Sequence, residues 1–174
     1  TSVVFANKKI ELADKIKKMI STDYYHIFTS SDVVGVETCA AIKNIFAMAI
    51  GSSKDFNTAA ALFQQSINEM ISFSKKINGK KETVIGLAGV GDLYVSAIGG
   101  RNSKMGRYLG EGLTFNEAKK IKMPNDTVEG ADLAKEIGNK VKSDFDIKSL
   151  PLMISVINTI CEGKALKIEW NYFK

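Results

Sequence analysis

The residues best suited to chemistry lie in two places, and the first is an apolar segment that contains a lysine. Lys43 and Asn44 interrupt Val36–Ile50, which is otherwise almost entirely apolar. A lysine is rarely buried without a partner, and withdrawal from water favours its neutral form, which can accept a proton. The alternative is that Lys43 carries its charged head to the surface along its aliphatic stem. The apolar turns on both sides of Lys43 favour a chemical role.

The second place is the glycine-rich stretch Gly86–Arg107, which holds six of the fourteen glycines of the chain. Arg101 and Asn102 follow directly on two glycines. A guanidinium held by a glycine turn, with an amide beside it, suits a bound phosphate because its planar fork donates paired hydrogen bonds. Composition alone slightly favours a simpler alternative, in which two turns connect helices and Arg101 is a surface residue.

The start of this stretch superficially resembles a strand that runs into a dinucleotide-binding turn. The dinucleotide fingerprint requires G-x-G-x-x-G, but Gly89–Gly91 is followed by Asp-Leu-Tyr, so the third glycine is missing. Asp92 would also place a carboxylate against the pyrophosphate. We therefore interpret Gly86–Gly91 as a tight turn that leads into a short helix.

The elements that position these residues form two groups. Ser2–Ala6 and Tyr24–Thr29 are strand-like segments on either side of the amphipathic helix Lys8–Ile20, which makes a βαβ-sized unit. We expect residues 1–31 to be the end of a larger α/β domain. The helices expected after Asp32 are Val36–Ile50, Asn57–Lys76, residues 114–121, a helix marked by apolar positions from Val128 to Val141, and Leu152–Glu162. The expected fold class is mainly α, with a second domain at residues 32–174.

Helix-terminus signals support several of these boundaries. Thr114 and Glu117 form a capping-box pattern, and Pro151 and Gly163 suit the first turn and the end of the last long helix. Glu129 has two open roles, a capping charge or a ligand contact. In the final segment, residues 165–170, we expect Leu166 and Trp170 to pack on the helices.

Composition excludes several classes of function. The net charge is +5, but the lysines are scattered as on solvated helix faces, which argues against a nucleic-acid-binding stripe. No uninterrupted apolar run reaches the roughly 18 residues of a membrane helix. Cys39 and Cys161 lie in apolar helical runs without metal-ligand spacing. We expect a cytoplasmic protein with buried, reduced thiols, no metal and no membrane partner.

Four motifs together resemble one enzyme family. In their order and spacing, Gly35–Asn44, Gly86–Leu93, Gly100–Asn102 and Val128–Gly130 are similar to NAD(P)-dependent sn-glycerol-3-phosphate dehydrogenases. The resemblance covers essentially the whole chain. It implies a multi-helix C-terminal substrate domain of the 6-phosphogluconate-dehydrogenase type, preceded by a short βαβ remnant of the NAD-binding Rossmann domain.

The resemblance also implies an activity and its residues. The family interconverts glycerol 3-phosphate and dihydroxyacetone phosphate with NAD or NADP, and Lys43 matches the proton acceptor for the substrate hydroxyl. The positions that match substrate-binding residues are Asn44, Asp92, Ser96, Gly100, Arg101 and Asn102. The positions that match cofactor contacts are Arg101, Thr127 and Glu129. A homodimer, a cytoplasmic location and a role in glycerophospholipid synthesis follow as further expectations.

The resemblance places the cofactor-binding glycine loop in the part of the Rossmann domain that residues 1–174 lack, so we expect no turnover from these residues alone. Two alternatives stay open. One is the helical domain of a related 3-hydroxyacid or 6-phosphogluconate-type dehydrogenase, although such enzymes usually separate the lysine and asparagine that are adjacent here as Lys43-Asn44. The other is a basic interaction module, which would leave a lysine inside an apolar helix without a purpose.

Overall fold

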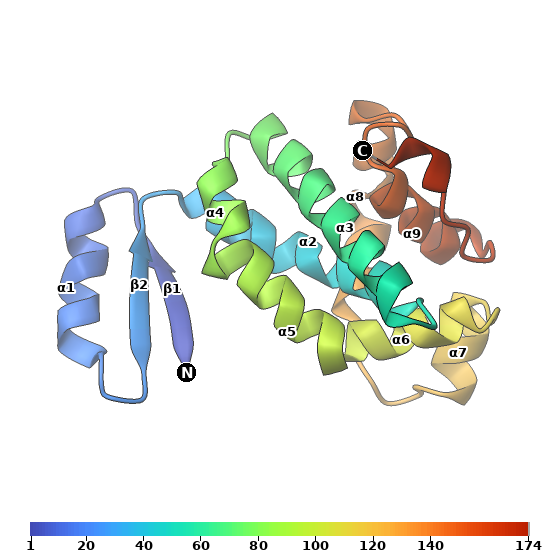
Figure 1. Cartoon of the computed structure of the whole chain (residues 1–174), viewed down its shortest axis with the longest axis horizontal. Helices are drawn as coiled ribbons and strands as arrows, with labels where there is room; N and C mark the ends of the chain where they lie inside the picture. The colour runs from blue at the N-terminus through green and yellow to red at the C-terminus, as the bar shows by residue number, and fades with distance from the viewer. Residues whose placement is uncertain (174) are drawn as a thin grey trace.

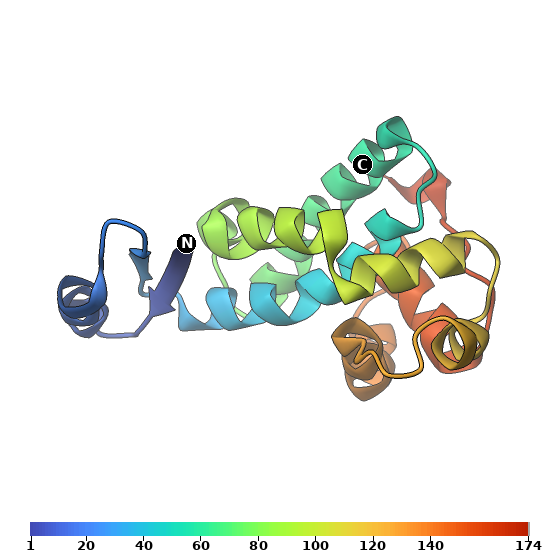
Figure 2. The same ribbon diagram turned by 90° about the horizontal axis from the view of Figure 1, so that it is seen from below.

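A small βαβ unit lies at one end of the molecule, and helices make up the remainder. The computed structural model describes residues 1–173 and shows this division from two directions (Figures 1 and 2). The chain begins in the βαβ unit and ends among the helices at the far side (Figure 1). The mainly α fold class is confirmed, as is the short βαβ unit that precedes the helices.

The βαβ unit consists of strand β1 (Ser2–Ala6), helix α1 (Ile10–Ile20) and strand β2 (His26–Ser30). The strands are parallel, with Ser2 opposite His26 and Ala6 opposite Ser30. Helix α1 packs against both strands with Ala13 buried, as its amphipathic sequence predicts. The only histidine of the chain, His26, is exposed, which agrees with a role outside catalysis.

The helical part begins immediately after this unit. Its elements are α2 (Val33–Gly51), α3 (Phe56–Lys76), α4 (Lys81–Ile85), the π-helix η1 (Leu87–Gly91), α5 (Asp92–Gly99), α6 (Arg101–Gly110), α7 (Phe115–Ile121), α8 (Glu129–Asp144), α9 (Pro151–Glu162) and the 3₁₀-helix η2 (Trp170–Tyr172).

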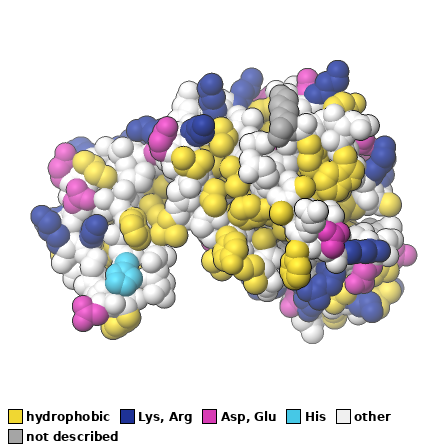
Figure 3. Space-filling model, in the orientation of Figure 1, with side chains coloured by type: hydrophobic (Ala, Val, Ile, Leu, Met, Phe, Trp, Pro, Cys, Tyr) yellow, Lys and Arg dark blue, Asp and Glu magenta, His cyan; other side chains and the backbone are white. Residues whose placement is uncertain are grey.

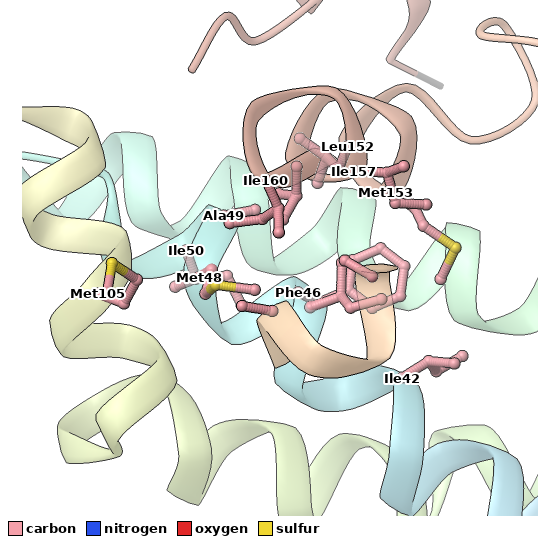
Figure 4. Close-up of a cluster of buried hydrophobic side chains, with 14 of the residues drawn as sticks. Ile42, Phe46, Met48, Ala49, Ile50, Met105, Leu152, Met153, Ile157 and Ile160 are labelled. Carbon is pink, nitrogen blue, oxygen red and sulfur yellow. The ribbon is translucent and has the colours of Figure 1, made fainter. Parts of the chain in front are cut away.

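Helix α2 is the centre of this part, because α3, α5, α6, α8 and α9 all contact it. Its residues 45–50 are all buried, as expected for a segment that is apolar on every side. Figure 4 shows Phe46, Met48 and Ala49 of α2 beside Leu152, Ile157 and Ile160 of α9. The residues labelled in Figure 4 belong to one continuous hydrophobic core.

By length and composition alone, α2 could also cross a membrane. Helix α2 is not an uninterrupted apolar run, because it contains the charged residues Glu37 and Lys43. Half of the apolar window is buried inside the protein. The core helix of a globular domain meets the same criterion, so α2 is weak evidence for a membrane.

Helix α6 approaches α2 so closely that glycine is required at the contact. A Cβ atom added to Gly106 would lie 2.0 Å from the carbonyl oxygen of Met48. No ordinary side chain fits there, since even an alanine would overlap the α2 backbone. This contact fixes α6 along α2 and thereby fixes the first residues of α6, Arg101 and Asn102.

Several local sequence signals are confirmed. Thr114 and Glu117 form the reciprocal capping box that opens α7. Pro151 is in the first turn of α9, and Gly163 ends that helix in the left-handed conformation with φ of 66°. Helix α2 starts at Val33, three residues earlier than expected, because the side chain of Asp32 caps it.

Three expectations are wrong in detail. The predicted tight turn Gly86–Gly91 is largely the π-helix η1, since the chain continues helically through its glycines. Trp170 is 46% exposed and packs on Phe173, whereas Leu166 does pack against the core. Cys161 is exposed, so only Cys39 is the expected buried thiol.

The buried carboxylate Glu69 joins α3 to the start of α9. Its two oxygens accept hydrogen bonds from the backbone N–H groups of Leu152, at 2.8 Å, and Met153, at 2.9 Å. Gln65 donates a third, at 3.1 Å. Burial raises the pKa of Glu69 to about 7, although all three hydrogen bonds act in the opposite direction. The sequence interpretation did not identify this link, because it joins residues more than 80 positions apart.

Candidate functional site

The first pair of the site is Lys43 of α2 and Asp92, the first residue of α5. The Lys43 ammonium donates a hydrogen bond to the Asp92 carboxylate, although the two residues are 49 positions apart. The Lys43 side chain is only 17% exposed. Lys43 therefore does not extend along the surface into water, and its charged head is directed at a specific partner.

A second group lies beside the first and includes Asn44. The Asn102 amide group donates to Asn44 Oδ1, at 3.1 Å, and to Glu129 Oε2, at 3.2 Å. Asn102 Oδ1 accepts a hydrogen bond from the backbone N–H of Gly130, at 2.8 Å. Arg101 completes the group by an ion pair with Glu129. We call these residues, with Lys43 and Asp92, the polar cluster.

The elements explain why adjacent residues serve different pairs. Consecutive residues of an α-helix point about 100° apart, so Lys43 faces α5 while Asn44 faces α6 and α8. Asn102 is 6% exposed and fills the space between α2 and the start of α8. Helix α8 has no side-chain cap at Val128, and Asn102 accepts the hydrogen bond of one of its free N–H groups instead.

Two residues with open roles, Glu129 and Arg101, meet in the polar cluster. The carboxylate of Glu129, the first residue of α8, contacts Arg101 and Asn102 and also adds a negative charge to the first turn of its own helix. The Arg101 side chain is 55% exposed and is paired, so it lies at the edge of the polar cluster. The polar cluster holds two cationic and two anionic side chains, which an incoming anion would have to separate.

Three predicted residues lie near the polar cluster without bonding to it. Ser96 is one turn beyond Asp92 on α5, and its carbonyl accepts a hydrogen bond from Gly100 N, at 3.3 Å. Gly100 joins α5 to α6. Thr127 is exposed, just before α8. Within residues 1–173, no side-chain hydrogen bond connects Ser96 or Thr127 to the polar cluster, so their roles stay predictions.

A groove of about 320 Å³ opens beside Asp92. It runs between β1 and the side of α2, and its lining includes Val3, Val36, Leu87 and Gly91. The groove places Asp92 at an accessible wall next to the strands. A ligand bound there would contact the βαβ unit on one side and the polar cluster on the other.

A larger groove, of about 1030 Å³, is elsewhere. It lies between α3, α5 and α6, and no member of the polar cluster lines it. In Figure 3, hydrophobic side chains gather near the middle of the visible face, and α5 carries exposed Tyr94, Val95 and Ile98. This groove is larger and is lined by Lys54, Asp55, Gln64 and Arg107 among others, but none of the ion pairs between described residues joins these side chains to one another.

The polar cluster offers proton transfer and anion binding. Among the described residues, no three His, Cys, Asp or Glu side chains are grouped as metal ligands. An ammonium beside a carboxylate can exchange a proton with a hydroxyl, and a guanidinium with two amides can hold an oxyanion. A small phosphorylated alcohol or ketone has both groups.

Similarity to known proteins points to the same kind of substrate. The model of the NAD-dependent glycerol-3-phosphate dehydrogenase C-terminus matches residues 32–170. The glycerol-3-phosphate dehydrogenase [NAD(P)+] of Clostridium tetani is 32% identical over 176 residues, which cover 96% of this chain and 48% of that protein. The NADP(+)-dependent enzyme of Archaeoglobus fulgidus is 31% identical, over 97% of this chain and 52% of the relative.

Structural similarity agrees with the sequence matches. The crystal structure of glycerol-3-phosphate dehydrogenase from Coxiella burnetii superposes with a TM-score of 0.82 at 28% identity, over 95% of this chain and 51% of that one. The chain therefore spans about half the length of these proteins.

Proposed function

Because the chain belongs to the NAD-dependent glycerol-3-phosphate dehydrogenase family, whose C-terminal domain it carries, we propose that it is the catalytic half of such an enzyme. The reaction is the interconversion of sn-glycerol 3-phosphate and dihydroxyacetone phosphate with NAD(H) or NADP(H). The observation that carries the proposal is the polar cluster, in which a shielded lysine–aspartate pair lies beside an arginine–amide group.

Each part of the polar cluster has a role in this reaction. Lys43, as the neutral amine, takes the proton of the substrate hydroxyl while the hydrogen on the same carbon leaves as hydride. Asp92 orients Lys43 and the hydroxyl. Arg101 and Asn102 hold the phosphate, whose charge replaces that of Glu129 at the guanidinium. In the reverse direction, the Lys43 ammonium returns the proton to the ketone oxygen.

The nicotinamide, when bound, supplies the hydride acceptor. The chain's own residues fit one side of such a group. The groove beside Asp92 brings the substrate position next to β1, and Glu129 and Arg101 are accessible for ribose hydroxyls and phosphate.

A hybrid enzyme tests the activity. In it, the part of the Clostridium tetani relative that the match leaves uncovered is joined ahead of Thr1. We expect the hybrid to oxidise NADH or NADPH when dihydroxyacetone phosphate is added, and residues 1–174 alone to show no such oxidation above a blank. A hybrid that folds and binds NADH, yet has no rate dependent on dihydroxyacetone phosphate, contradicts the proposed function.

Further proposals follow from the family alone. A cytoplasmic homodimer that supplies glycerol 3-phosphate for lipid synthesis agrees with the family assignment. The related alternatives lose support, since the family model matches most of the chain and the polar cluster gives Lys43 a partner that a basic interaction module would not require.

A further inference from the structure

The buried carboxylate Asp32 binds the beginnings of two helices that are distant in sequence. It is 7% exposed and caps α2 by accepting a hydrogen bond from Gly35 N at Oδ1, at 2.9 Å. Its other oxygen, Oδ2, accepts from Lys80 N, at 2.8 Å, and from the Thr83 hydroxyl, at 2.6 Å. These two donors are 48 and 51 positions away. A cap of α2 alone would need only the first bond.

The backbone is also tight at this junction. The N–H of Asp32 itself donates to Ser30 Oγ, at 3.1 Å, at the end of β2. A Cβ atom added to Gly79, just before α4, would lie 3.0 Å from the Cα of Gly35. Burial alone would raise the pKa of Asp32, but hydrogen bonds from Thr83, Lys80 and Gly35 outweigh burial and lower it. The carboxylate is therefore ionised at neutral pH.

The two helices joined by Asp32 carry the two members of the reactive pair. Lys43 is about two turns beyond Gly35 on α2. From Thr83 the chain continues through α4, Gly86 and η1 directly into Asp92. The π-helical bond from Gly91 N to Gly86 O, at 3.2 Å, keeps this path continuous. Asp32 thus ties the segments at one end, and the Lys43–Asp92 pair lies at the other.

We infer that Asp32 is a positioning residue, which sets the α4–η1–α5 segment along α2 so that Asp92 meets Lys43. The inference deepens the proposed function and rests on it for what the Lys43–Asp92 pair does. The side chain of Asp32 accepts hydrogen bonds from Gly35, Lys80 and Thr83, and it forms none with Lys43 or Asp92. It acts through the backbone of α4 and the hydroxyl of Thr83.

The variant Asp32→Asn isolates this role. Asparagine caps a helix as well as aspartate does, so the bond to Gly35 N is kept. Its amide nitrogen cannot accept a hydrogen bond, which leaves Lys80 N facing another donor. The matched control is Asp55→Asn. Asp55 caps α3 by contacts to Thr58 of its own helix, and among the described residues no hydrogen bond ties its side chain to a distant segment.

The measurement is the labelling of Lys43 by an amine-reactive ester, quantified by mass spectrometry on residues 1–174. Lys140, an exposed lysine on α8, is the internal reference. We expect Asp32→Asn to raise Lys43 labelling at least about threefold, as for the loss of a partly shielded ion pair. Asp55→Asn should leave it unchanged. Equal labelling in Asp32→Asn and wild type, or an equal rise in Asp55→Asn, would overturn the inference.

Thr83→Val is the second variant, and it decides the question if Asp32→Asn does not fold. It removes one bond to Oδ2 and leaves the cap of α2 intact. We expect a smaller rise in Lys43 labelling, with unchanged circular dichroism. No rise in a folded Thr83→Val would contradict the inference. The labelling needs neither substrate nor cofactor, so it can fail while the proposed reaction holds, and the hybrid assay can fail while the labelling succeeds.

In the hybrid enzyme, Asp32→Asn should lower kcat for dihydroxyacetone phosphate more than it raises KM, because the phosphate contacts stay in place. Asp55→Asn should change neither value. A general loss of structure would instead raise the labelling of Lys43 and lower the circular dichroism in both variants.

Discussion

Lys43 is the residue on which the proposed chemistry depends. In the hybrid enzyme, Lys43→Ala should lower kcat by about 10²–10⁴, the usual effect of removing a general acid–base group. The fold should persist, since alanine suits a helix interior. The matched control is Lys104→Ala. Lys104 is an exposed lysine on the nearby helix α6, and it pairs with Asp126. A Lys43→Ala variant with a kcat close to wild type would place the base elsewhere.

Substitution of a second residue, Arg101, tests the recognition of the substrate phosphate. Arg101→Ala should lower kcat/KM for glycerol 3-phosphate. The loss should correspond to roughly 2–4 kcal/mol of activation free energy, because a phosphate dianion loses a charge-assisted, paired contact. Arg101→Lys should recover only part, since an ammonium lacks the planar fork. Glycerol, which has no phosphate, should be used equally poorly by wild type and variant.

Arg107→Ala is the control for Arg101, because Arg107 lies on the same helix and lines the large groove outside the polar cluster. We expect its kcat/KM to equal that of the wild type. Equal losses for glycerol and glycerol 3-phosphate in Arg101→Ala would show that Arg101 does not recognise the phosphate.

At the scale of elements, the π-helix η1 sets where Asp92 enters the site. Gly89 packs on α4 so closely that an added Cβ atom would lie 1.9 Å from the carbonyl oxygen of Val84. Gly89→Ala should therefore destabilise the chain by about 2 kcal/mol or more, as expected for overpacking against a backbone. Urea unfolding followed by circular dichroism measures the change.

Gly99→Ala is the matched substitution at the end of α5, where an added Cβ atom meets no atom within 4 Å. It should be neutral or stabilise by up to about 1 kcal/mol, because alanine favours helix over glycine. Similar free energies of unfolding for the two variants would contradict the close contact described for η1.

The long elements were predictable from sequence, and the glycine-rich ones were not. Helix α3 begins and ends within a residue of the expected range, because its apolar positions recur at helical spacing and a glycine follows. The π-helix carries no such periodicity. The glycines of η1 suggested a turn, but they allow close packing against α4. The approach of another element is not encoded in the local sequence.

Individual residues of the polar cluster were predictable from the sequence, but the pairs that they form were not. Lys43 stood out because it interrupts an apolar helix, and Arg101 because it follows two glycines. Their partners Asp92 and Glu129 are 49 and 28 positions away. Such distant contacts cannot be deduced from the local sequence. The same holds for the hydrogen bonds of Asp32 to Lys80 and Thr83.

At the scale of the whole molecule, Glu69 gives stability a pH dependence. Its pKa is about 7 in the folded chain and near 4.5 when unfolded, so between these values the folded state binds more protons. The free energy of unfolding should therefore fall as pH rises from about 4.5 to about 7, by on the order of 2 kcal/mol. Urea unfolding at pH 5 and pH 8 measures it.

Glu69→Gln provides the comparison, because the amide does not titrate. The difference in unfolding free energy between wild type and variant cancels the other titrating groups. We expect the wild type to lose stability relative to Glu69→Gln between pH 5 and pH 8. A constant difference across this interval would show that Glu69 keeps one protonation state.

The central claim is that the polar cluster recognises a small phosphorylated polyol, and one titration tests it most directly. Residues 1–174, labelled with ¹⁵N, are titrated with sn-glycerol 3-phosphate and separately with glycerol, and amide shifts are followed by NMR. We predict that the shifts centre on Asn44, Asp92, Asn102 and Gly130, and that glycerol at the same concentration produces much smaller ones. Shifts of equal size with glycerol, or shifts centred outside the polar cluster, would contradict the account.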